Sequence, residues 1–216
     1  REMMRRYEAI VKFKRDYWIE RTGVYDEDDL QDVEFEVIRE DIWVHEIEDF
    51  DVDAHWAQGW TNEDYNFQRE DSMEHTDCVT HRVFPTRYRL NDFRLTKSLR
   101  RVLNKNRDLK TIIRPLCVTP RKSALYEKHY ARYGEKVYLR LQDKYRFPSR
   151  FPVKDMELCV YQNRKLLACS IFVVARKSIQ SNSAFWDLNE PRRSLGILTV
   201  MLEMQYAIRK KKDFYY

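Results

Sequence analysis

The chain has 216 residues, of which 43% are hydrophobic and 14% aromatic, a composition that excludes a disordered polar chain and allows one large or two small folded domains. Its net charge of +5 hides a strong asymmetry. Residues 23–77 carry 2 basic and 20 acidic side chains, whereas residues 78–216 carry 31 basic and 11 acidic ones. The basic part predicts a surface that binds a polyanion, and the alternative is an ordinary solvated face.

Two classes of protein are disfavoured at once. The chain has no run of 18 apolar residues, so we expect no membrane-spanning helix. Its four cysteines lie at positions 78, 117, 159 and 169 without a CxxC pair, which fits a reducing cytoplasm better than a disulfide framework. The chain starts at Arg1 and stops inside an expected strand at Tyr216, so we expect the natural protein to continue at both ends.

The first 55 residues form an uncertain helical and acidic segment. Apolar positions between residues 2 and 21 predict a helix that ends near Gly23. Short alternations at 33–37 and 42–44 predict two edge strands. We place the boundary of this segment at residue 55, so that residues 56–216 form the main domain.

The main domain begins with a helix end at 55–60, closed by Gly59, and a polar stretch at 61–80 that predicts a loop. The alternation over 83–90 predicts a strand that carries Arg87 and Arg89 on its outer side. These two cations are candidates for attracting an acidic group.

Residues 97–107 form the most distinctive segment. Read as a helix capped by Thr96 or Ser98, the segment separates its chemistry by face. Leu99, Val102 and Leu103 form an apolar side that would hold the helix on a core. The other side presents fixed polar and cationic groups to a polyanion: Lys97, Arg100, Arg101, Asn104, Lys105 and Arg107.

The rest of the chain alternates strands and helices. We expect a strand over 109–117, a helix from Pro120 to about Tyr133, a hairpin from strands 157–161 and 166–174, and a third strand at 183–187. A long helix over 195–211 has so wide an apolar face that it should lie on a sheet.

The turn before that helix is the second candidate site. Arg192, Arg193 and Ser194 precede Leu195 and Gly196, at a helix start whose first backbone N–H groups have no internal partners. Such a turn suits a phosphate or a terminal nucleotide, and Gly196 would let a ligand approach the backbone. The alternative is an ordinary helix capped by the Ser194 side chain.

Several motifs together resemble the aminoacyl-tRNA–protein transferases, the arginyl/leucyl transferase family of the N-degron pathway of protein degradation. The first is Phe93 followed by residues 97–106 (KSLRRVLNKN), paired with Phe185-Trp-Asp and with Ser194-Leu-Gly. Residues 56–60, 85–90 and 204–206 also resemble family positions. The resemblance implies an α+β fold of N-acetyltransferase type, a mixed and mainly antiparallel sheet flanked by helices.

The resemblance also implies a reaction and its participants. The family moves an aminoacyl group, such as arginine or leucine, from aminoacyl-tRNA to the α-amino group of a protein N-terminus, often Asp or Glu. The basic-helix residues, Lys105 included, would then bind tRNA, and Arg193, Ser194, Leu195 and Gly196 would hold the terminal nucleotide and its aminoacyl group. We infer from charge that Arg87 and Arg89 bind the acidic acceptor. Asp187 and Tyr206 are weak candidates for handling the proton of the amine, with structural roles as the alternative.

No cofactor besides aminoacyl-tRNA and no metal is expected. His75, Cys78 and His81 offer three ligands without a fourth, so we prefer a polar loop there. Two alternatives stay open: an acetyl-CoA-dependent N-acyltransferase, disfavoured because the turn has only one glycine, and a non-catalytic RNA-binding module.

Overall fold

In the computed structural model, the residues described are 5–13, 35–43, 51–63, 66–70, 72–74, 80–82, 84–133, 140–145, 149 and 153–216. The chain divides into two compact units, residues 1–47 with 55–85 and residues 48–54 with 86–216. Residues 55–85 therefore group with the N-terminal part, whereas the sequence suggested a single domain over 56–216.

The first unit is built from antiparallel strands. Strands β1 (Arg5–Phe13), β2 (Phe35–Trp43), β4 (Asn66–Glu70) and β3 (Thr61–Glu63) form one sheet in the order β1-β2-β4-β3, and β5 (Ser72–Glu74) pairs with β6 (Thr80–Arg82). The helix predicted for 2–21 is thus wrong over 5–13. Tyr7, Ala9, Val11 and Phe13 recur at every second position, with the charged Glu8 and Lys12 among the residues between them, which favours a strand.

Two further expectations for this unit are corrected. The loop predicted at 61–80 contains strands, because pairing partners rather than apolar alternation hold polar strands such as β3 in place. Strand β2 lies between β1 and β4, so it is not an edge strand.

Helix α2 (Val52–Ala57) lies at the boundary of the two units and ends as the sequence predicts. Gly59 has a φ of 85°, a backbone conformation that side chains disfavour, and the Trp60 N–H bonds back to the His55 carbonyl. Trp56 is buried beside this turn at 1% exposure.

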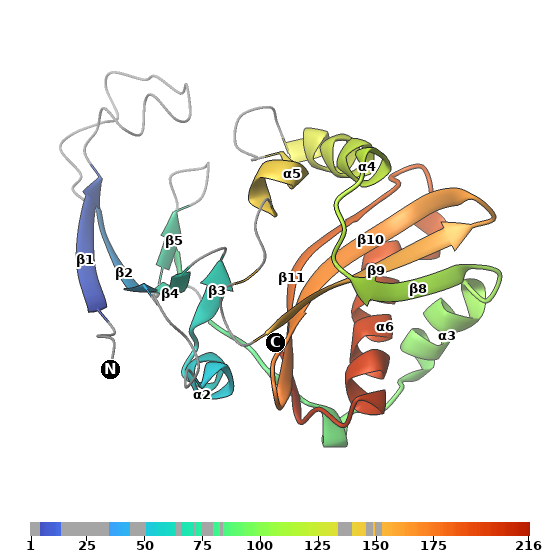
Figure 1. Cartoon of the computed structure of the whole chain (residues 1–216). Coiled ribbons are helices and arrows are strands. Elements are labelled where there is room, and N and C mark those ends of the chain that lie inside the picture. The colour runs from blue at the N-terminus through green and yellow to red at the C-terminus, as the bar shows by residue number, and fades with distance from the viewer. Residues whose placement is uncertain are drawn as a thin grey trace. The chain divides into compact units, whose positions relative to one another are not determined.

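The second unit contains a six-stranded sheet in the order β7-β12-β11-β10-β9-β8 (Figure 1). Its strands are β7 (Tyr88–Arg89), β8 (Lys110–Pro115), β9 (Lys154–Gln162), β10 (Lys165–Val174), β11 (Ser178–Trp186) and β12 (Phe214–Tyr215). Every pairing is antiparallel except β11 with β12, which are joined by helix α6 (Leu195–Arg209). The predicted α+β class, with a mixed and mainly antiparallel sheet flanked by helices, is confirmed.

Two apolar clusters cover the two faces of this sheet. Residues of α6 and of α3 (Lys97–Lys105) pack with Ala168 and Phe172 in one cluster, while α4 (Pro120–Tyr130) and α5 (Leu141–Lys144) contribute to the other with Cys169 and Ile171. Since β10 is buried on both faces, its sequence is a continuous apolar run, as expected for a central strand.

Three short 3-10 turns complete the unit: η1 (Leu90–Asp92), η2 (Ala131–Tyr133) and η3 (Pro191–Arg193). The strand predicted over 83–90 shortens to Tyr88–Arg89, because its partner β12 offers only Phe214 and Tyr215 for pairing. Among the described residues, no helix has the length and apolar character needed to span a membrane.

Candidate functional site

Helix α3 has the two-sided character that the sequence predicts. The Leu99 N–H donates to Thr96 Oγ1 at 3.3 Å, so Thr96 is the cap, and Val102 and Leu103 pack against the core. The polar side is exposed throughout: Lys97, Arg100, Arg101, Asn104 and Lys105, with Arg107 exposed in the turn that follows. The predicted basic face therefore exists as a solvent-facing surface.

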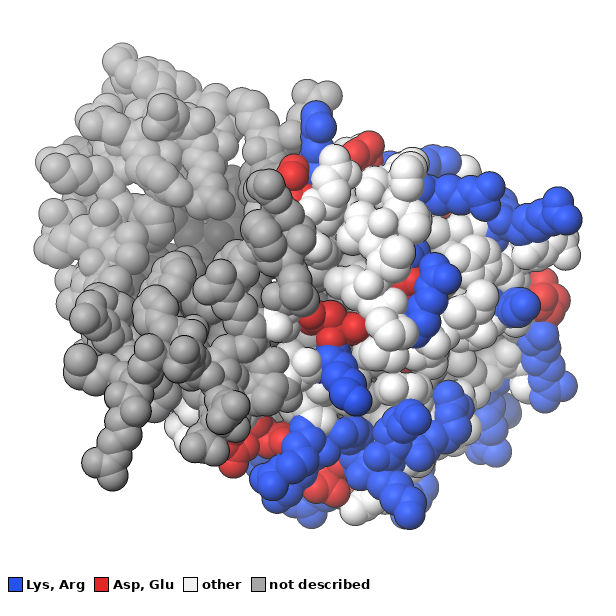
Figure 2. Space-filling model, viewed as in Figure 1, with Lys and Arg blue, Asp and Glu red and all other residues white. Residues whose placement is uncertain are grey.

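The cations on this face are not held by any described carboxylate. Within the part of the chain that the structure describes, Lys97, Arg100, Arg101 and Arg107 form no ion pair. Figure 2 shows Lys and Arg side chains outnumbering Asp and Glu on the visible face of the described residues. Unpaired and hydrated guanidinium and ammonium groups are available to phosphates without breaking internal bonds.

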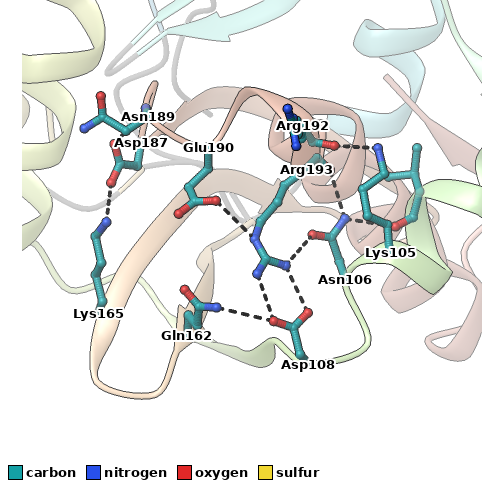
Figure 3. A network of polar contacts seen from close by, with 11 residues as sticks. Lys105, Asn106, Asp108, Gln162, Lys165, Asp187, Asn189, Glu190, Arg192 and Arg193 are labelled. Carbon is teal, nitrogen blue, oxygen red and sulfur yellow. Dashed lines mark hydrogen bonds and ion pairs between the residues drawn. The ribbon is translucent and has the colours of Figure 1, made fainter.

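The C-terminal end of α3 is bonded directly to the loop before α6 (Figure 3). Lys105 Nζ donates to the Arg192 carbonyl. The Asn106 amide, only 6% exposed, donates to the carbonyls of Val102 and Arg193, both at 2.9 Å. The two segments that the sequence singled out thus belong to one rigid joint.

A charged network reinforces this joint. Arg193 donates to both carboxylate oxygens of Asp108 at 2.9 Å, and its Nε lies 3.3 Å from Glu190. The hydrogen bond from Arg193 lowers the pKa of Asp108, so the pair stays ionised at neutral pH. The Arg193 guanidinium, which we expected at the terminal nucleotide, therefore stabilises the joint.

Ser194 adopts a left-handed conformation, with φ 54° and ψ 48°, and its side chain makes no capping hydrogen bond. The interpretation of Ser194 as an ordinary side-chain cap is therefore wrong. Its carbonyl accepts from the Leu198 N–H, so α6 begins properly while its first N–H groups receive no side-chain oxygen. The start of α6 keeps the partial positive charge of an uncapped helix end.

Gly196 is required by the packing of a neighbouring side chain. A Cβ atom at this position would lie 2.8 Å from the Trp186 ring, which is closer than packing allows. The Trp186 backbone is in turn bonded to His129 Nδ1 at 3.1 Å, and Arg132 lies over its ring at 5.1 Å. Burial lowers the pKa of His129, which favours the neutral imidazole in this contact.

The two residues predicted to handle a proton occupy different surroundings. Asp187 is 5% exposed, pairs with Lys165 at 2.8 Å, and accepts from the Asn189 N–H at 3.0 Å. Burial opposes its ionisation, but these hydrogen bonds outweigh burial and lower the pKa of Asp187. Asp187 is thus a weak base that anchors the end of β11. Tyr206 packs edge-on to Phe172 at 5.6 Å.

The candidate acceptor residues lie on the sheet edge formed by β7. Arg87 and Arg89 are both exposed. The Arg87 guanidinium lies over the Phe214 ring at 4.6 Å, and Arg89 Nε is 3.8 Å from Asp92. Neither residue shares a described contact with the α3–α6 joint.

A second charged group is buried beside β9. Glu157, fully buried, lies 2.5 Å from Lys122 and 2.7 Å from Arg114. Its carboxylate and the thiols of Cys159 and Cys169 lie within 4.8 Å of one another, a grouping that could hold a metal ion. Lys122 already neutralises the Glu157 carboxylate, so this carboxylate has no uncompensated charge to offer a metal ion. His75, Cys78 and the loop predicted around them lie outside the described residues, apart from the strand that contains His81.

Sequence reasoning missed Asn106, Asp108 and Trp186 as parts of the site. A polar pair directly after a basic helix is a detectable signal of a helix end, but the partner of Asp108 lies 85 residues away. A contact between residues so far apart in the sequence leaves no local pattern from which it could be predicted.

The comparisons with known proteins agree with the resemblance seen in the motifs. Residues 121–216 match the model of the C terminus of arginine-tRNA-protein transferase. An aspartate/glutamate leucyltransferase of Campylobacter jejuni is 26% identical over 165 residues, which cover 74% of this chain and 67% of the relative. One from a Shewanella species is 29% identical over 143 residues, which cover 61% of this chain and 56% of the relative.

Among solved structures, the structure of L-PGS from Bacillus licheniformis is similar with a TM-score of 0.47 and 10% identity, over 60% of this chain and 44% of that one. The matched C-terminal segment contains the start of α6 and one side of the joint, Glu190, Arg192 and Arg193. The other side, Lys105, Asn106 and Asp108, precedes that segment. Over its C-terminal part, the chain is therefore similar to the aminoacyl-tRNA–protein transferases.

Proposed function

We propose that the protein transfers an aminoacyl group from aminoacyl-tRNA to the α-amino group of a protein N-terminus. The unpaired cations of α3 bind phosphates near the acceptor end of the tRNA. The start of α6 receives the terminal nucleotide, through its uncapped N–H groups and Ser194. No cofactor besides the aminoacyl-tRNA is required.

The observation that carries this proposal is the joint between the two elements. The contacts from Lys105, Asn106 and Arg193 fix the end of α3 against the loop that starts α6. A nucleic acid bound along α3 would therefore have its end held at a constant distance from the α6 start. Such fixed placement of one substrate is what transfer between two bound substrates needs.

The reaction is an ester aminolysis. The neutral α-amine attacks the ester carbonyl, a C–N bond forms, and the C–O bond to the terminal ribose breaks. The amine loses one proton and the ribose hydroxyl gains one, so no net oxidation or hydrolysis occurs. A free α-amine has a pKa near 8, so orientation and the removal of one proton account for most of the work.

The acceptor is proposed to be a protein that begins with Asp or Glu. Arg87 and Arg89 offer exposed guanidinium groups of the right sign, and the relatives are named aspartate/glutamate leucyltransferases. Such a reaction marks N-termini for degradation and would take place in the cytoplasm, a location that the three free cysteines of the described part also suit.

The test uses the full-length protein with tRNA charged with labelled arginine or leucine, and a peptide that begins with Asp. Label in the peptide supports the proposal. Transfer only from acetyl-CoA would replace it with an N-acetyltransferase, and retention of tRNA without transfer would replace it with an RNA-binding module.

A further inference from the structure

Helix α6 carries a carboxyl group in an unusual position. Glu203 is 0% exposed and faces the sheet, where Tyr215 of β12 donates a hydrogen bond to Glu203 Oε2 at 2.7 Å. The hydroxyls of Ser170 on β10 and Ser181 on β11 also face this carboxyl group. A strand irregularity between Ile171 and Phe172 lies directly beside it, as irregularities often do at sites.

No described cation compensates the charge of this acid. Within the described residues, Glu203 forms no ion pair, and its Oε1 is buried without a hydrogen-bond partner. Tyr215 is the other titratable group that faces it. Burial raises the pKa of Glu203 to about 7, and the hydroxyls offset only part of that. Every other buried carboxylate described in this unit, Glu157 and Asp187, has a lysine partner.

We infer that Glu203 receives the guanidinium of an arginyl group carried on tRNA, and that it selects arginine over leucine as the group transferred. This inference rests on the proposed function and names the donor within it. A guanidinium has five N–H donors in a rigid fork, which would engage the unpartnered Oε1 and the nearby hydroxyls together.

The distance along α6 suits this role. Glu203 lies eight residues after Leu195, or about 12 Å along the helix from the end proposed for the terminal nucleotide. An arginyl side chain spans about 7 Å from its Cα, and the ribose ester adds the remaining length. The uncharged leucyl side chain would bury the carboxylate without a partner, which is unfavourable.

The comparisons leave the donor open, since the matching family model names arginine and the relatives are named leucyltransferases. The carboxyl group is closed off in this structure, so the side chain of Tyr215, itself 8% exposed, must move when the arginyl group binds. The Tyr215 hydroxyl donates the hydrogen bond to Glu203 Oε2 that the guanidinium would replace.

The experiment compares full-length wild-type protein and Glu203→Gln in single-turnover transfer from Arg-tRNA and Leu-tRNA. The amide keeps the size of the side chain and can still accept from Tyr215. We expect wild type to use arginine, and Glu203→Gln to lose about 100-fold in arginyl transfer, as when a buried polar partner is removed, without a matching loss for leucine. Glu127→Gln, on the exposed side of α4, is the control and should leave both rates unchanged.

A second measurement does not depend on the variant. Arginine amide should raise the unfolding temperature of wild type, whereas citrulline amide, with the same shape and no charge, should not. Leucine-only transfer by wild type, an equal loss for both donors in Glu203→Gln, or equal stabilisation by the two amides would each overturn the inference and leave the proposed function standing. Absence of transfer from both tRNAs by wild type would remove the proposed function and this inference together.

Discussion

The outer face of α3 and the loop before α6 are both rich in charge, but they use it in opposite ways. On α3 the cations Lys97, Arg100 and Arg101 point to solvent, and no described carboxylate pairs with them. In the loop, Arg193 is only 17% exposed and is held by Asp108 and Glu190. Paired charges in this unit fix geometry, whereas unpaired ones are available for a ligand.

The largest effect is expected where a paired charge is fully buried. Glu157→Gln would leave the Lys122 ammonium, itself 2% exposed, without a counter-ion. Because an uncompensated buried charge is costly, we expect a loss of about 4 kcal/mol in the free energy of unfolding, measured with urea. Glu127→Gln should change it by less than about 0.5 kcal/mol, and an equally small change in Glu157→Gln would contradict the role of the pair.

Glu203 provides the opposite case of a buried acid without a cation. Burial raises its pKa from 4.5 to about 7 in the folded protein. Folding is therefore favoured while the group is protonated, and this contribution is lost as pH rises from about 4.5 to 7. We expect wild type to lose about 3 kcal/mol relative to Glu203→Gln between pH 4 and pH 8.

The measurement is urea unfolding of both proteins across that pH range. Tyr215, whose pKa burial moves above its usual range, stays neutral throughout and does not contribute. Parallel stability profiles for the two proteins would show that Glu203 is not perturbed.

The unpaired cations are tested by charge reversal. Changing Lys97, Arg101 and Arg107 to Glu should lower affinity for tRNA by about 100-fold at 0.1 M salt and flatten its salt dependence, since about three phosphate contacts are lost. Lys105 is left intact because it bonds to Arg192. Filter binding against salt gives the affinity, and unfolding should be unchanged.

The matched control reverses Arg164, Arg176 and Lys177, which are exposed elsewhere in the same unit. It makes the same change in net charge. Equal losses from both triple variants would mean that net charge, not the α3 face, determines tRNA binding.

Pairing in the joint should produce a smaller, measurable coupling. A double-mutant cycle of Arg193→Ala and Asp108→Ala should give a small but measurable coupling energy, because the pair is bidentate but partly exposed. The Arg89–Asp92 pair, separated by 3.8 Å with side chains 64% and 68% exposed, should give almost none. Indistinguishable values would remove the distinction between the two regions.

The sequence predicted the elements whose patterns are local. The faces of α3, the Thr96 cap, the hairpin of β9 and β10 and the extent of α6 all follow from periodicity, cap residues and turn residues. The N-terminal unit was read poorly, because the period of two in β1 competes with a helical spacing of the same apolar residues and because β3 to β6 are short and polar.

The site was predicted in its parts but not in its connections. Both candidate segments were identified, yet the bonds between them join residues 85 to 87 positions apart. The packing constraint on Gly196 was not predicted, because its neighbour Trp186 approaches only through the packing of α6 on the sheet. The burial of Glu203 was not predicted, since one acidic residue within an amphipathic helix normally lies on the solvent side.

The left-handed backbone of Ser194 links the stability of the fold to the proposed activity. A residue with a side chain in the left-handed region costs about 1 kcal/mol that glycine would avoid. Replacing it with glycine would relax the backbone and also delete the hydroxyl that the proposed nucleotide site presents. The chain therefore tolerates a locally unfavourable turn at the point where, on our proposal, the substrate binds. A substitution that makes the fold more stable at this position would lower the activity.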